Sequence, residues 1–168
     1  MATVTTTAIS EFQIRDYRQS EFEELFSSLP DVTAIEVNGA YKGRLYALMG
    51  VEKLPRIICR TIMWIINNPL GVWAGKGFYE TVGANVWFTV KKKIRLGYYN
   101  ISIKESHDQT GQIMHLDYDI DKNMKILRPI YGEAKPINPD YYLCRMMYRT
   151  AKKDHCVMYF TLKTPDDQ

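Results

Sequence analysis

Lys76 is the residue whose surroundings most suggest chemistry. It lies between two glycines and has Trp73 and Phe78 close to it in the chain. A lysine beside aromatic side chains can bind a carboxylate, or has a lowered pKa if it is buried. The alternative interpretation is a solvent-facing lysine in a glycine loop.

Glu133 and Arg145 form a second candidate. Glu133 is in register with the apolar Tyr131, and Arg145 with Leu143. We expect a carboxylate and a guanidinium on the interior faces of nearby strands to pair, because a lone buried charge is costly. Such a pair can hold the polar end of a ligand in an apolar cavity. A slip of one residue in the alternation would instead leave both groups in water.

These patterns favour a ligand-binding site over a metal or cofactor site. The three histidines are scattered, without metal-ligand spacing, and His115 is expected to point away from the apolar face of its strand. The sequence predicts no metal and no cofactor, and the chain has no P-loop, Rossmann or Gly-x-Ser-x-Gly pattern. The expected ligand-binding residues are Tyr41, Trp73, Lys76, Tyr118, Arg128, Glu133 and Arg145.

Two helices are expected, one before the first strand and one after it. Apolar residues recur with helical spacing between residues 20 and 29, with Ser20 as N-cap and Glu23 completing a capping box. We expect this helix to close one end of the sheet. A second helix is predicted over residues 54–67, either buried on most sides or lying over a cavity.

About eight strand-like segments are expected. The first is residues 35–48, between the two helices, and the others are separated by short connections after Gly71. Residues 98–104 and 114–120 alternate apolar and polar with a period of two. A long antiparallel meander in a small chain usually closes, because closure removes the exposed edges. The predicted fold is mainly β: a closed antiparallel barrel with two short helices. Residues 1–19 are expected to be a flexible tail, 20–164 one domain and 165–168 a second tail.

Composition sets limits on partners and location. The chain has 168 residues and a net charge of +3, too small to indicate nucleic-acid binding by itself. A basic run at residues 91–95, followed by two tyrosines, is interpreted as a solvated turn. No segment reaches the length of a membrane span, and the N-terminus lacks the pattern of a signal peptide. We expect a cytoplasmic protein with free thiols, although Cys144 and Cys156 could face each other across a hairpin; a homodimer is left open.

Several short motifs resemble an uncharacterised bacterial family named for its Gly-x-Trp-x-Gly motif. They are Phe22–Pro30, Gly39-x-Tyr41-x-Gly43 and Trp73–Phe78, while the second half resembles the domain of unknown function that follows in that family. Tyr41 replaces the tryptophan of the name-giving motif and is expected to plug the bottom of the barrel. The first motif also resembles the opening of lipocalins and nitrobindin-type barrels, which implies a calycin-like fold.

The leading functional hypothesis is a binding protein for a small hydrophobic or amphipathic ligand, such as a fatty acid. One alternative is an enzyme that uses Lys76 and Glu133 as acid and base on a ligand in the same cavity. A second is a haem-binding barrel, which the resemblance to nitrobindins suggests. The remaining hypothesis is a structural or interaction protein with a filled core.

Overall fold

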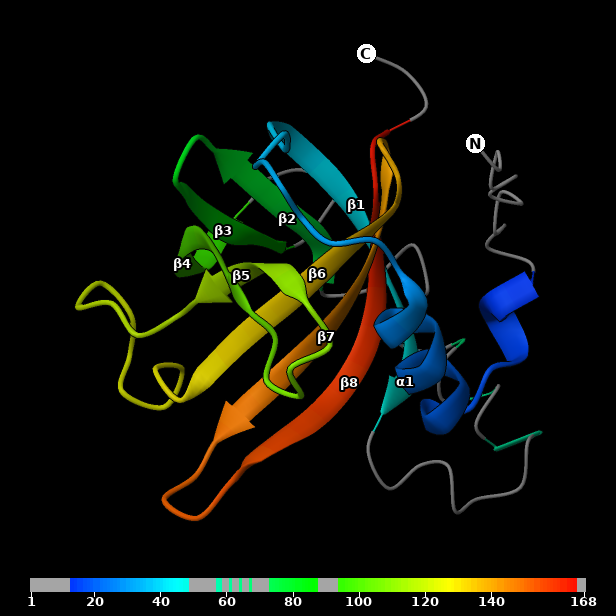
Figure 1. Ribbon diagram of the computed structural model, residues 1–168. Coiled ribbons are helices and arrows are strands. Elements are labelled where there is room, and N and C mark those ends of the chain that lie inside the picture. Colours follow the sequence, from blue (N-terminus) through cyan, green and yellow to red (C-terminus); the bar gives the residue numbers. More distant parts are fainter. Residues whose placement is uncertain are drawn as a thin grey trace.

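The chain folds into one closed antiparallel barrel in which every strand pairs with the next and the last pairs with the first (Figure 1). The computed structural model describes residues 13–48, 57, 58, 61, 64, 67, 73–87 and 94–165. The strands are β1 (Gly39–Leu48), β2 (Trp73–Tyr79), β3 (Val82–Trp87), β4 (Ile94–Glu105), β5 (Gln112–Asp117), β6 (Ile130–Asn138), β7 (Tyr141–Arg149) and β8 (Asp154–Lys163). The predicted closed, calycin-like barrel is therefore confirmed.

Alternating side chains divide the core between the inside and the outside of the barrel. One set, the interior cluster, draws its members from the strands and from the segment before β1: Val32, Val37, Tyr41, Phe78, Tyr99, Ile101, Met114, Leu116, Tyr118, Ala134, Tyr142, Cys144, Phe160 and Leu162. The other, the outer cluster, joins the opposite faces of the strands to the helices: Ile14, Phe22, Phe26, Leu29, Tyr46, Ile113, Ile137, Tyr141, Leu143 and Tyr159. A residue and its neighbour on one strand thus belong to different cores.

The helix α1 (Gln19–Ser28) lies against the outer wall of the barrel (Figure 1). Its stripe of Phe22, Phe26 and Leu29 is buried, as the sequence predicted. The expected position at one end of the sheet is wrong, because this stripe packs on outward side chains of five strands. The cap also differs: the backbone N–H of Arg18, not of Ser20, donates to a carboxylate, that of Glu21, at 2.7 Å.

The folded part of the chain begins before residue 20. A short 3₁₀ helix, η1 (Gln13–Asp16), places Ile14 in the outer cluster with no exposed surface. Residues 13–19, which were expected to be part of a flexible tail, therefore belong to the packed domain. Residues 1–12 lie outside the described part of the chain.

The second predicted helix lies mostly outside the described residues. Ile57, Ile58, Thr61 and Trp64 are helical, and both isoleucines and the tryptophan are exposed. Within the described residues, no helix has the length and apolar character needed to cross a membrane. The segment around Lys76, for which a glycine loop was the alternative interpretation, is the extended strand β2.

Candidate functional site

Lys76 lies inside the barrel. Pairing between strands places Tyr41 of β1, Lys76 of β2 and Asn85 of β3 side by side. The Nζ atom lies over the rings of Tyr99, Tyr118 and Phe160, at 4.7, 5.1 and 5.5 Å from their centroids. All three rings belong to the interior cluster, and the lysine is 3% exposed. The structure therefore supports the interpretation in which Lys76 is buried, and not the one in which it faces solvent.

Two polar groups meet the Lys76 amine. Nζ donates to the Asn85 Oδ1 at 2.7 Å and is in close hydrogen-bond contact with the hydroxyl of Tyr118. The Tyr118 hydroxyl also donates to the Asn85 Oδ1, at 3.3 Å, and the Trp73 indole N–H reaches the same oxygen at 3.4 Å. The Asn85 side-chain oxygen therefore links Trp73, Lys76 and Tyr118.

The amine has no anionic partner among the described residues. Burial without a counter-ion disfavours the charged form, and it lowers the pKa of Lys76 to about 7. Burial also raises the pKa of Tyr118 well above its usual range, so that its phenol stays protonated. A proton can therefore be exchanged at Lys76 near neutral pH in an otherwise apolar space.

Glycines set the wall around this site. β2 is irregular between Trp73 and Gly75, where Gly75 has φ +140° and a Cβ would lie 2.0 Å from the Tyr41 carbonyl oxygen. A Cβ on Gly43 would lie 2.3 Å from the ring of Trp73. Gly43 leaves room for the indole of Trp73, and Gly75 lets the backbones of β1 and β2 approach each other. The indole also meets Phe160 of β8 edge to face at 5.4 Å. Both glycines thus mark places where β1 and β2 pack closely together.

Tyr41 is buried inside the barrel near the start of β1, as expected for a plug. It makes edge-to-face contacts with Phe78 at 5.2 Å and Tyr142 at 5.9 Å. Tyr142 also lines a pocket of about 280 Å³ beneath the segments 30–36 and 136–139. The pocket therefore borders the interior cluster at the end of the barrel where Tyr41 lies.

Glu133 and Arg145 pair as predicted, but on the outer face of the barrel. The Arg145 Nε donates to the Glu133 Oε2 at 2.6 Å, and the guanidinium lies over the ring of Phe26, 4.3 Å from its centroid. Neighbouring Ala134 and Cys144 point inward. The expected interior position is therefore wrong, and so is the alternative of a solvent-exposed pair: α1 covers side chains that are 1% and 2% exposed.

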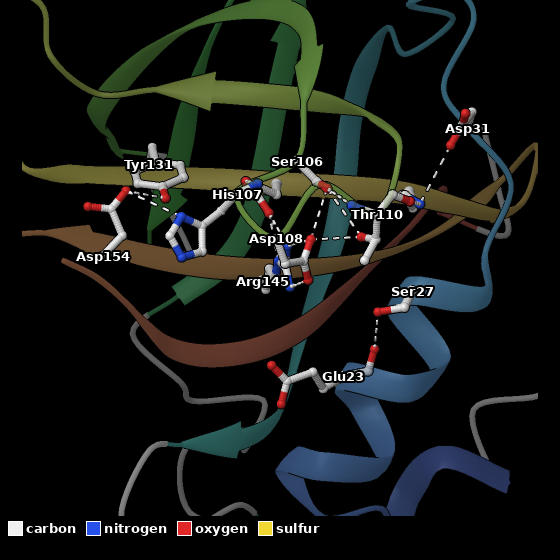
Figure 2. Close-up of polar contacts among 12 residues, drawn as sticks. Glu23, Ser27, Asp31, Ser106, His107, Asp108, Thr110, Tyr131, Arg145 and Asp154 are labelled. Atoms are coloured by element: carbon white, nitrogen blue, oxygen red, sulfur yellow. Dashed lines mark hydrogen bonds and ion pairs between the residues drawn. The ribbon is translucent and has the colours of Figure 1, made fainter.

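The same guanidinium fixes the β4–β5 turn, as Figure 2 shows. Arg145 donates to both oxygens of Asp108 at 2.8 and 2.9 Å, and Glu133 accepts from the backbone N–H of His107 at 2.8 Å. Ser106 and Thr110 also donate to Asp108, at 2.9 and 2.7 Å. This network fastens a turn to the wall and leaves the Arg145 guanidinium with two carboxylates.

The remaining candidates do not join the interior site. Arg128 is partly exposed in the loop before β6, where it bonds the side chain and carbonyl of Asp121. His115 points outward, as expected, and stacks on Tyr131. Cys144 and Cys156 are both free and belong to opposite sides of the wall. Among the described residues, no group of three metal-ligating side chains could hold an ion.

Sequence reasoning missed three residues of the interior site: Asn85, Tyr99 and Phe160. Asn85 stands in an otherwise apolar strand, and a polar residue in such a position was the one available signal. It also missed Lys135, which is fully buried on the outer face and donates to the carbonyls of Leu29 and Thr110 at 3.2 and 2.9 Å.

Comparison with known proteins gives the fold and no function. No protein-family model matches the chain, and no curated protein matches it. A solved structure titled "Crystal structure of protein from Thermomonospora curvata" is similar, with a TM-score of 0.54 and 17% sequence identity. The match covers 88% of this chain and 87% of that one, so the likeness extends over almost the whole barrel.

Proposed function

We propose that the barrel binds a small amphipathic molecule of the fatty-acid kind, with its anionic end on Lys76. The observation that carries this proposal is a buried amine for which the described residues supply no counter-ion. A ligand carboxylate would supply the missing charge in a medium where such hydrogen bonds are strong. Aromatic side chains around the amine would receive the apolar part of the ligand.

Two other buried cations in the part of the chain that the structure describes provide a contrast with Lys76. Arg145 has two carboxylates, and Lys135 has two carbonyl oxygens and Asp31 at 3.7 Å. Both lie on the outer face, where they join the barrel to α1 or to the β4–β5 turn. Lys76 joins no such elements, so a purely structural role explains it less well than the other two.

The ligand would reach Lys76 past the tyrosines at one end of the barrel. Tyr142 lines the 280 Å³ pocket, and Tyr41 lies between Tyr142 and the register position of Lys76. Rotation of these two rings would open the pocket toward the interior. This route favours a slender molecule over a broad one.

The positions of the described residues favour the enzyme and haem-binding hypotheses less. Lys76 and Glu133 lie on opposite faces of the barrel wall, so an enzyme using both on one substrate is not proposed. For haem, the one buried histidine, His115, points outward, while His107 and His155 are not buried. Membership of the Gly-x-Trp-x-Gly family, a cytoplasmic location and a homodimer all remain predictions.

A titration with a fluorescent fatty acid tests the proposal, alongside native mass spectrometry of protein purified from bacteria. We expect Lys76→Met to weaken binding about tenfold or more, since a charge-assisted hydrogen bond contributes about 1.5–3 kcal/mol. The matched control is Lys104→Met, which removes an exposed lysine of β4 and should leave affinity unchanged. Equal affinity of the Lys76→Met variant and the original protein would overturn the proposal.

A further inference from the structure

We propose that Lys76 also forms a reversible imine with the aldehyde group of an apolar ligand, and that Tyr118 gives the proton that this reaction needs. The inference rests on the proposed function, because the ligand must enter the barrel. It goes further by naming a second ligand class, long-chain aldehydes, and a covalent step at the same amine.

The surroundings of Lys76 favour a nucleophilic amine. An amine attacks a carbonyl only through its free lone pair, so the neutral form must be populated. Nζ is buried against three ring faces, and no carboxylate of the described residues holds its proton. With a pKa of about 7, roughly half of the amine is neutral at neutral pH.

Tyr118 is placed to act as the acid. Its hydroxyl contacts Nζ directly, and its second neighbour is the Asn85 Oδ1 at 3.3 Å. The phenol carries its proton at neutral pH and touches Nζ, so a proton donor lies beside the amine. A carbonyl oxygen bound beside Nζ would lie within reach of the same hydroxyl.

Other nucleophiles in the described part of the barrel are less suited. Cys144 lies inside, but burial raises the pKa of its thiol and so suppresses the reactive thiolate. Lys135 is on the outer face with its amine held by two carbonyl oxygens. Lys76 is therefore the expected site of attack.

The step balances without an oxidant or a reductant. The Nζ lone pair forms a bond to the aldehyde carbon, and Tyr118 protonates the carbonyl oxygen while the nitrogen releases a proton. The proton released by the nitrogen restores the Tyr118 phenol, which then protonates the hydroxyl of the carbinolamine. The hydroxyl leaves as water while the nitrogen lone pair forms the C=N bond, and the remaining N–H proton returns to Tyr118. The products are one imine and one water, and hydrolysis reverses the reaction.

Decanal and sodium cyanoborohydride, added to the full chain at pH 7, test the inference by trapping the imine as a stable alkyl amine. Peptide mapping should place one adduct on Lys76, formed about tenfold faster than on exposed Lys104, because a lowered pKa leaves far more neutral amine. The Lys76→Met variant should lack it. Binding of cinnamaldehyde gives a second readout without reductant, since imine formation shifts its absorbance.

The outcomes separate the two proposals. Binding of decanoate with adducts only on exposed lysines, and no shift of cinnamaldehyde absorbance, would overturn the imine and leave the proposed function standing. Failure to bind either decanoate or decanal would overturn both. For Tyr118→Phe, which keeps the ring and Lys76, we expect labelling of Lys76 to slow about tenfold; an unchanged rate would overturn the acid role of Tyr118.

Discussion

Arg145 binds both carboxylate oxygens of Asp108, at 2.8 and 2.9 Å, and so ties β7 to the turn between β4 and β5. The guanidinium is 2% exposed, whereas the side chain of Asp108 is 29% exposed. A buried cation thus lies between a fully buried carboxylate, Glu133, and a partly exposed one. The arrangement explains how a charged side chain is kept on the buried outer face of the barrel wall.

Removing this cation should destabilise the fold strongly. Arg145→Met leaves Glu133 buried without a partner, and we expect a loss of about 3–5 kcal/mol in the free energy of unfolding. Arg149→Met is the matched control: its partner Asp117 and the arginine itself are 28% and 35% exposed, so its loss should stay within about 1 kcal/mol. Urea denaturation measures both. Similar losses for the two variants would contradict the assigned importance of the buried network.

The ion pair between Arg145 and Asp108 should also contribute to acid unfolding. Partial burial by itself raises the pKa of Asp108. Hydrogen bonds from Arg145 and Thr110 outweigh burial and hold this pKa well below its usual 3.8. A depressed carboxyl pKa stabilises the fold above the unfolded value, and this stability is lost as the pH falls through the folded value. We therefore expect stability to drop below about pH 4, and to drop less in Asp108→Asn. Circular dichroism during acid titration measures this, and identical acid profiles would rule it out.

Lys76 should also make stability rise with pH, but over a higher pH range than Asp108. Its folded pKa is lowered from 10.5 to about 7, so between these values the unfolded chain binds a proton that the folded protein lacks. Stability should rise with pH from about 7 to 9, above which the buried thiol of Cys144, with its raised pKa, opposes the rise. Lys76→Met should remove the rise and stabilise the protein at pH 7. Urea melts at several pH values test this prediction; the fully buried Lys135→Met provides a variant that should instead destabilise.

Two glycines with positive φ give a test of the barrel wall. At Gly75 a Cβ would meet the Tyr41 carbonyl at 2.0 Å, while at Gly39, φ +81°, nothing lies within 4 Å of it. Gly39→Ala should therefore cost only the backbone strain, about 1–2 kcal/mol. Gly75→Ala should cost clearly more, about 3 kcal/mol or above, because β1 must also move away from β2. Thermal melting of the two variants checks the order, and equal losses would contradict the close approach.

The sequence by itself determined the class of fold. Period-two alternation and short connections predicted eight antiparallel strands, and the cost of exposed edges predicted closure. The same alternation predicted the outward His115, and the apolar spacing of Phe22 and Phe26 predicted a helix with one buried stripe. Each of these follows from local pattern, which a chain carries without reference to its partners in space.

Only the tertiary structure decided which charges lie inside. The sequence showed that Glu133 and Arg145 share faces with apolar neighbours, yet this barrel has two apolar surfaces, because α1 covers part of its outer wall. Alternation reveals that a residue is on a buried face but not which of the two faces it is. Lys76 could not be placed for a related reason. Its depth depends on the rings of Tyr99 of β4, Tyr118 just after β5 and Phe160 of β8, which meet only when the sheet closes.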